Sequence, residues 1–143
     1  MVKVAYNSCY GGFGLSDAAV RRYAEIKGIT LYPEPSGYSL ITYWTVPPEE
    51  RGVVLSSEDF YKASEEARRA SNEFYRANQI YGRDIERTDP VLIQVIEELG
   101  DKANGQCAKL AITELAAGTQ YRIDEYDGYE TVETRESYDW KVA

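Results

Sequence analysis

The first 28 residues constrain the fold more than any other stretch, because a strand, a glycine-rich loop and a helix follow one another directly. Residues 2–6 alternate between the two faces and include β-branched side chains, which is typical of a strand. Residues 7–14 form a loop with three glycines in its last four positions. A helix then begins after Ser16, an N-cap residue, and ends at Gly28. This pattern predicts an N-terminal β-loop-α unit.

The next segment reads as a turn followed by a strand. Residues 33–37 contain two prolines and a glycine, which favour a turn. Residues 38–46 alternate with large side chains on both faces, so we expect a central strand that is covered on both sides. Pro47 and Pro48 end that strand, because proline removes a backbone donor.

An alanine-rich helix is predicted to run from Ser56 to Tyr81, with Leu55 and Phe60 as a hydrophobic staple at its start. Pairs of opposite charge four residues apart lie on its polar face, at Glu58/Lys62 and Glu65/Arg69. The alanines on its apolar face allow another surface to approach closely. We expect this alanine-rich face to pack on the sheet of the same chain, and a homodimer through residues 57–81 is the alternative. The apolar stripe consists of Phe60, Ala63, Ala67, Ala70, Phe74, Ala77 and Tyr81.

The last part of the chain combines a third helix with three strands. A charged connector over residues 83–87 leads to Asp89, an N-cap, and a helix that ends at Gly100. A strand over residues 107–115 and a hairpin over residues 121–135 follow. We therefore expect a single α+β domain over residues 1–143, with a mixed β-sheet, about three helices, the N-terminal unit and the C-terminal hairpin.

The two-residue Asp127-Gly128 turn fixes the register of this hairpin. Ile123 then pairs with Val132, and Tyr121 with Thr134, on a face suited to the core. Glu125 lies directly opposite Glu130, and like charges in that position repel each other. Either both carboxylates extend into water, or a basic group neutralises them.

Composition removes several kinds of chemistry. The chain has no histidine, which excludes Ser/His and Cys/His dyads, zinc bound by histidine and imidazole switching. Its 16 basic and 24 acidic residues give a net charge of −8, which disfavours nucleic acid and membrane surfaces as partners. No run of 18 apolar residues and no signal peptide is visible. Cys9 and Cys107 are too few for a disulfide framework, so we expect an intracellular, reduced protein, and a bridge between them requires two strands that bring them together.

The glycine-rich loop is the first candidate site. Amide N–H groups that gather before a helix suit a phosphate or carboxylate, although the spacing departs from GxGxxG and P-loop patterns. The alternative is a tight crossover in which glycines permit positive φ and close packing. Cys9 is the one candidate nucleophile, but no base is placed beside it, so we assign no catalytic residue. The candidate ligand-binding residues are Asn7, Cys9, Gly11, Gly12, Gly14 and Ser16.

The acidic end is the second candidate site. Residues 121–143 hold seven carboxylates and three basic residues, a net of −4, interleaved with tyrosine and tryptophan. Aromatic anchors and steering charges suit a protein partner with a basic surface, and the alternative is a solvated hairpin face. EF-hand spacing fails because Ile123 would occupy the first ligand position, so no metal or cofactor is assigned. The candidate partner-binding residues are Glu125, Tyr126, Asp127, Tyr129 and Glu130.

Three stretches of this chain together resemble a family of small proteins of unknown function that tailed bacteriophages encode. They are YNSCYGGFGLS at residues 6–16, RTDP at 87–90 leading into EELG at 97–100, and IDEYDG at 123–128. The likeness spans most of the chain except about residues 33–85. The resemblance implies a phage accessory protein that acts in a bacterial cytoplasm, and it carries over no activity or catalytic residue.

The function we expect is non-enzymatic binding of a host protein or a small anionic ligand. Two alternatives use the loop around Cys9: a nucleotide-binding or sequestering protein, and a thiol enzyme. Mimicry of DNA by the acidic surface is disfavoured, because a charge of −8 on 143 residues is modest.

Overall fold

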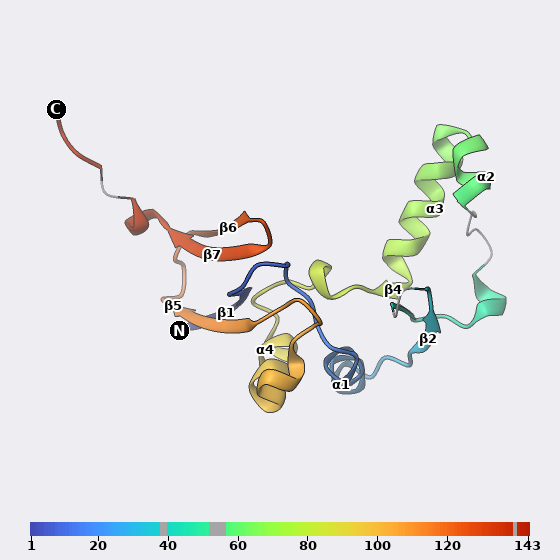
Figure 1. Cartoon of the computed structure of the whole chain (residues 1–143), viewed down its shortest axis with the longest axis horizontal. Coiled ribbons are helices and arrows are strands. Elements are labelled where there is room, and N and C mark those ends of the chain that lie inside the picture. The colour runs from blue at the N-terminus through green and yellow to red at the C-terminus, as the bar shows by residue number, and fades with distance from the viewer. Residues whose placement is uncertain (38–39, 52–56, 139) are drawn as a thin grey trace. The chain divides into compact units, whose positions relative to one another are not determined.

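The computed structural model describes residues 1–37, 40–51, 57–138 and 140–143, which form two compact units. The first unit consists of residues 1–27 and 82–143, and the second of residues 28–81. Four α-helices and seven strands are present among the described residues (Figure 1). This confirms the α+β class. A single domain over residues 1–143 stays a prediction.

The helices are α1 (Asp17–Lys27), α2 (Ser57–Lys62), α3 (Glu65–Ala77) and α4 (Pro90–Leu99). The strands are β1 (Val2–Asn7), β2 (Tyr32–Pro35), β3 (Ile41–Trp44), β4 (Gln79–Ile80), β5 (Leu110–Leu115), β6 (Tyr121–Tyr126) and β7 (Tyr129–Thr134). In the described parts of the chain these strands form three small sheets, in the orders β1-β5, β2-β3-β4 and β6-β7. Every pair is antiparallel, so the expected mixed sheet is corrected to three antiparallel ones.

The core of the first unit lies between the β1-β5 ladder and the helices α1 and α4. The N-terminal β-loop-α unit is confirmed: the Ser16 hydroxyl oxygen accepts a hydrogen bond from the Ala19 amide at 3.1 Å, and Gly28 has a φ of 73° after the last turn. Asp89 caps α4 through the Val91 amide at 2.8 Å. The buried apolar side chains include Val4, Ala5, Ala19, Val20, Tyr23, Leu92, Val95, Ile96 and Ala103.

Strand β5 begins later than predicted, at Leu110 instead of Cys107. The Ala108 amide donates to the Gly105 carbonyl at 3.1 Å, which folds these residues into a turn. The Leu110 amide then donates to the Asn104 side chain at 2.9 Å. These local bonds replace the ladder bonds that an earlier strand would make.

The C-terminal hairpin has the predicted register throughout. Ile123 lies opposite Val132, Tyr121 opposite Thr134, and Glu125 opposite Glu130. Strand β7 lies against β1, and Val132 is half-buried there while Tyr121 stays partly exposed. The predicted core face is therefore the correct one, although its burial increases toward the turn.

In the second unit, β3 is the central strand, as predicted, but it is shorter and less covered. Pro33 and Pro35 lie in the edge strand β2, where their missing N–H groups cost no ladder bond, and not in a turn. Trp44 is buried and stacks near Tyr75 with ring centroids 5.2 Å apart, whereas Ile41 at the other end is exposed. The predicted strand residues 38 and 39 lie outside the described residues.

The prediction of a single long helix from Ser56 to Tyr81 is wrong, because the helix is interrupted between α2 and α3. The Ser64 hydroxyl accepts the Ala67 amide at 3.2 Å and starts a new helix. Arg68 donates to the Phe60 carbonyl at 2.8 Å and so satisfies the end of α2. The predicted start at Ser56 and the staple residue Leu55 lie outside the described residues.

The buried face of α3 also differs from the predicted alanine stripe. Ser71 is buried, whereas Ala70 and Ala77 are exposed. The two predicted ion pairs are present, with nitrogen–oxygen distances of 3.2 Å for Lys62–Glu58 and 3.6 Å for Arg69–Glu65. The homodimer through residues 57–81 stays a prediction. No helix within the described ranges has the length and apolar character that crossing a bilayer requires.

Candidate functional site

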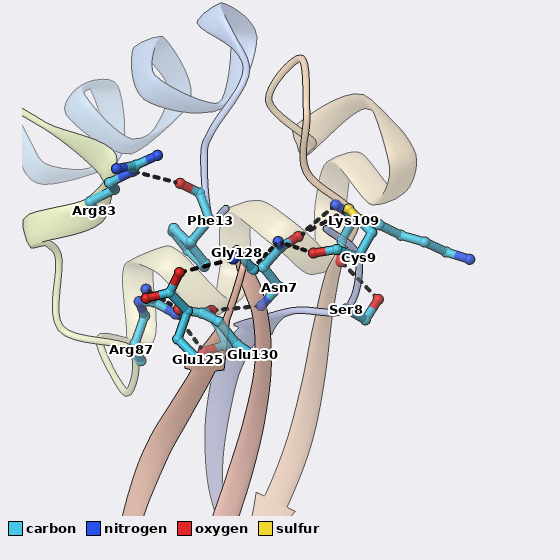
Figure 2. A network of polar contacts seen from close by, with 11 residues as sticks. Asn7, Ser8, Cys9, Phe13, Arg83, Arg87, Lys109, Glu125, Gly128 and Glu130 are labelled. Atoms are coloured by element: carbon cyan, nitrogen blue, oxygen red, sulfur yellow. Dashed lines mark hydrogen bonds and ion pairs between the residues drawn. The ribbon is translucent and has the colours of Figure 1, made fainter. Parts of the chain in front are cut away.

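The two surfaces predicted separately meet at one place in the first unit. The hairpin turn packs directly on the glycine-rich loop, and Gly128 is buried there (Figure 2). A Cβ atom added to Gly128 would lie 2.2 Å from the Gly12 nitrogen and 2.6 Å from the Gly11 nitrogen. The Gly11 amide also donates to the Asp127 carbonyl at 3.2 Å. These glycines therefore serve the close approach of two backbones.

The Asn7 side chain holds the loop and the hairpin turn together through hydrogen bonds. Its side chain is wholly buried, and its Nδ2 donates to the carbonyls of Cys9 at 2.7 Å and Gly128 at 2.8 Å. Its Oδ1 accepts from the Lys109 amide at 2.8 Å. Both donors and the acceptor are thus used within the protein. The structure places this predicted ligand residue in a structural position.

Glu130 is neutralised by a residue that is distant in the sequence. Arg87 donates to both of its carboxylate oxygens, at 2.6 and 3.0 Å, and the Asn7 amide adds a third bond at 2.8 Å. The Arg87 guanidinium also lies 3.7 Å from the centroid of the buried Phe13 ring. Of the two outcomes predicted for the Glu125–Glu130 pair, a basic group therefore neutralises Glu130. Because Glu130 is 7% exposed, little of it is accessible to a partner.

Glu125 has a different role from Glu130, which lies opposite it. Its carboxylate accepts the Gly128 amide at 2.9 Å, which closes the turn, and the residue stays exposed. Asp127 occupies the left-handed region with a φ of 49°, and it is exposed as well. These two carboxylates are the parts of the predicted acidic surface that face solvent at the turn.

A hollow of about 380 Å³ lies where the loop, the turn and the connector meet. Five of the predicted candidate residues line it, together with four residues that were not predicted as candidates. The lining consists of Gly11, Gly12, Phe13, Arg83, Arg87, Glu125, Asp127, Gly128 and Glu130.

The connector residue Arg83 is the main addition. Its Nε donates to the Phe13 carbonyl at 3.3 Å, and its Nη2 would lie 3.0 Å from a Cβ atom at Gly12. Across the described ranges, no carboxylate lies within 4.0 Å of its guanidinium. The charged run at residues 83–87 was the available signal, but no local pattern places it beside the glycines.

The start of α1 is closed by the protein itself. The Ser16 hydroxyl accepts the Ala19 amide and donates to the Lys102 carbonyl at 2.6 Å, and its own amide donates to the Ala103 carbonyl at 2.9 Å. The Gly14 carbonyl accepts the Gly105 amide at 2.9 Å. Gly14 and Ser16 thus hold the helix against the 3₁₀ helix Gly100–Ala103, and they do not line the hollow.

Cys9 is half-buried, and two acceptors lie within hydrogen-bond reach of its single S–H group, the Cys107 carbonyl at 3.3 Å and the Asn7 Oδ1 at 3.5 Å. Strand pairing therefore brings the two cysteine residues close together, as a bridge would require, but both are free thiols. Among the described residues, its hydrogen-bond partners are a carbonyl and an amide oxygen, which do not act as bases.

Three tyrosines lie around the same turn. Tyr10 is 63% exposed and Tyr126 is 76% exposed, and the Tyr10 and Tyr129 rings lie 5.4 Å apart between centroids. We call the tip surface the five exposed residues of this region, Tyr10, Glu125, Tyr126, Asp127 and Tyr129.

In the described part of the chain, no three cysteine or carboxylate side chains gather closely enough to hold a metal ion. Comparison with protein-family models, curated proteins and solved structures finds no match to this chain.

Proposed function

We propose that this chain is a non-enzymatic binding protein whose tip surface engages a host protein with a basic surface. We further propose that it is a phage accessory protein that acts in a bacterial cytoplasm. The resemblance at residues 6–16, 87–100 and 123–128 supports the second part. The tip surface supports the first part, because it combines exposed aromatic rings with carboxylates.

The observation that carries the proposal is the assignment of charges at the hairpin turn. Arg87 neutralises Glu130 internally, whereas Glu125 and Asp127 remain exposed beside the three tyrosines. Tyrosine supplies contact area at low cost in conformational entropy, and exposed carboxylates steer a basic partner. The net charge of −8 adds to that steering.

Two hydrogen bonds hold the backbone of the tip surface in place. The Gly11 amide donates to the Asp127 carbonyl at 3.2 Å, and the Asn7 Nδ2 donates to the Gly128 carbonyl at 2.8 Å. A surface held in place before binding loses less conformational entropy when a partner docks.

The alternatives fit this geometry less well. A nucleotide or another multiply charged anion in the hollow would meet Glu125 and Asp127 as well as Arg83. A thiol enzyme would need a base at Cys9, and the described partners of that thiol are neutral oxygens.

A pull-down from host lysate tests the proposal with two matched variants. The first carries Tyr126→Ala and Asp127→Asn, which remove one ring and one charge from the tip surface. The control carries Tyr61→Ala and Asp101→Asn, because Tyr61 is 79% exposed and Asp101 is exposed, and both lie outside the tip surface. Glu130 is unsuitable for such a test, because its removal would disturb the Arg87 pair.

We expect the tip variant alone to lose a specific captured protein. The purified pair should then show at least about tenfold weaker binding with the tip variant. Added salt should weaken the wild-type complex, because the carboxylates contribute through long-range attraction. Equal capture by both variants would overturn the proposal.

A further inference from the structure

The hollow beside the tip surface contains charges that the protein leaves unused. Five charged side chains line it: Arg83, Arg87, Glu125, Asp127 and Glu130. Arg87 and Glu130 cancel each other through their two hydrogen bonds. One guanidinium and two carboxylates remain.

We propose that this hollow binds a small dipolar molecule, an amino carboxylate, with its carboxylate at Arg83 and its ammonium group at Glu125 and Asp127. This goes beyond the binding of a host protein, because it assigns a small-molecule site that shares Glu125 and Asp127 with the tip surface.

Arg83 is positioned as an anion receptor. The bond from its Nε to the Phe13 carbonyl, at 3.3 Å, fixes the guanidinium at the edge of the loop. Gly12 leaves the space beside it open, because any side chain there would begin 3.0 Å from Nη2. The Nη groups have no acceptor among the described residues, and their planar arrangement matches a carboxylate.

Glu125 and Asp127 are positioned as cation receptors. Glu125 lies near the end of β6 and Asp127 in the turn that follows it, whereas Arg83 belongs to the connector. Figure 2 shows Glu125 on the hairpin and Arg83 on a separate segment. One oxygen of Glu125 accepts the Gly128 amide at 2.9 Å, which leaves the other for a ligand. Neither carboxylate has a basic partner within 4.0 Å among the residues that the structure describes.

The charge balance decides the class of ligand. A simple anion would gain from Arg83 but would be repelled by two carboxylates. A simple cation would gain from the two carboxylates, but it would be repelled by Arg83 and would leave the Arg83 Nη groups without an acceptor. A phosphate would carry still more negative charge toward those carboxylates. A molecule with one carboxylate and one ammonium group can pair its carboxylate with Arg83 and its ammonium group with Glu125 and Asp127. The volume of about 380 Å³ lies in the range of small-molecule sites.

Calorimetric and NMR titrations of the full chain test the proposal with matched probes. The dipolar probes are γ-aminobutyrate, δ-aminovalerate and ε-aminocaproate, each with one carboxylate and one ammonium group at a different separation. Caproate and hexylamine carry the anionic and cationic halves alone. We expect at least one dipolar probe to bind about tenfold or more tightly than either half. Equal binding of all probes, caproate or hexylamine binding as tightly as the dipolar probes, or no binding by any of them would overturn the proposal.

Variants show whether Arg83 and the two carboxylates contribute as proposed. Arg83→Gln should lower the affinity of the tightest-binding dipolar probe to that of hexylamine. Glu125→Gln combined with Asp127→Asn should lower its affinity to that of caproate. Arg135→Gln is the matched control, because Arg135 is exposed in the same unit and lies outside the hollow. A dipolar probe that binds unchanged to both site variants would overturn the site.

Glu125 and Asp127 belong to both proposed sites, but a substitution at Tyr126 alone distinguishes them. Tyr126 does not line the hollow, so Tyr126→Ala should leave probe binding unchanged while it weakens capture of a host protein. Circular dichroism of each variant confirms that the exposed substitutions leave the fold intact.

Discussion

Arg87 and Glu130 form a two-bond ion pair across 43 residues of sequence, with nitrogen–oxygen distances of 2.6 and 3.0 Å. The backbone around Arg87 also bonds to β1, because the Ala5 amide donates to the Arg87 carbonyl at 2.9 Å. The Asn7 amide at the end of β1 donates to Glu130. The pair therefore joins three segments that have no sequence proximity: β1, the connector and the hairpin.

Removal of Glu130 should destabilise the first unit strongly. Glu130→Ala leaves the Arg87 guanidinium, whose side chain is 16% exposed, without its partner. Loss of one member of a buried pair typically costs about 3–5 kcal/mol in the free energy of unfolding. Urea denaturation measures this loss. Glu133→Gln on the same strand is the control, because its Arg122 partner is 66% exposed, and we expect a loss of about 0–1 kcal/mol.

A double variant separates the cost of a lone charge from the worth of the pair. Arg87→Met with Glu130→Met removes both charges and retains side-chain volume, so it should be more stable than Glu130→Ala. If Glu130→Ala were no more destabilising than Glu133→Gln, the pair would not hold the segments together.

Gly128 should tolerate no side chain, because the hairpin turn touches the loop at that position. Gly128→Ala would place a Cβ atom 2.2 Å from the Gly12 nitrogen. Gly118 has the same φ of 85° but has open space around its position. Both substitutions incur about 1–2 kcal/mol for the left-handed conformation. Overlap should add about 1–3 kcal/mol at Gly128 alone, measured by thermal or urea unfolding. Equal losses would contradict the contact.

The elements that could be predicted from sequence are those fixed by neighbouring residues. Ser16 and Asp89 bond to amides three and two positions ahead, and the Asp127-Gly128 turn sets the hairpin register on its own. Each of these signals spans only a few neighbouring residues, so it can be recognised in a single sequence without knowledge of the tertiary fold.

The parts that escaped prediction depend on distant partners or on competing local signals. Asn7 bonds to Gly128 and Lys109, each more than 100 positions away, and no periodicity marks such a residue. Ser64 followed by Glu65 and Glu66 is a helix-start signal, but the regular spacing of alanines masked it. The hollow was missed because Arg83 is placed by the tertiary fold.

Asp89 should make the stability of the first unit depend on acid pH. Burial opposes ionisation of this carboxyl, but hydrogen bonds from Tyr23, the Val91 amide and Lys27 outweigh it and lower its pKa below the usual 3.8. A lowered folded-state pKa gives stability that is present above the unfolded value and is lost as pH falls through the folded value. The wild type should therefore lose more stability below about pH 3.8 than Asp89→Asn does.

Asn is as good an N-cap as Asp, so Asp89→Asn retains the bond to Val91 while it removes the charge. Urea midpoints measured from neutral to acid pH give the comparison. Asp101→Asn, at an exposed position, controls for the loss of one carboxylate. Parallel curves for the wild type and Asp89→Asn would show that this carboxyl does not contribute to the acid response.

Asn7→Asp should separate the structural role of this residue from a direct role in ligand binding. The substitution changes the size little, but it replaces two N–H donors by a carboxylate oxygen that faces the carbonyls of Cys9 and Gly128. Because the site is fully buried, we expect a loss of more than about 3 kcal/mol near neutral pH. Burial raises the pKa of a carboxyl group, so part of the loss should be recovered as pH falls and the new group takes up a proton. Asn72→Asp on the exposed side of α3 is the matched control, with an expected change within about 0.5 kcal/mol. A stable Asn7→Asp protein that has lost only probe binding would instead make Asn7 a ligand residue.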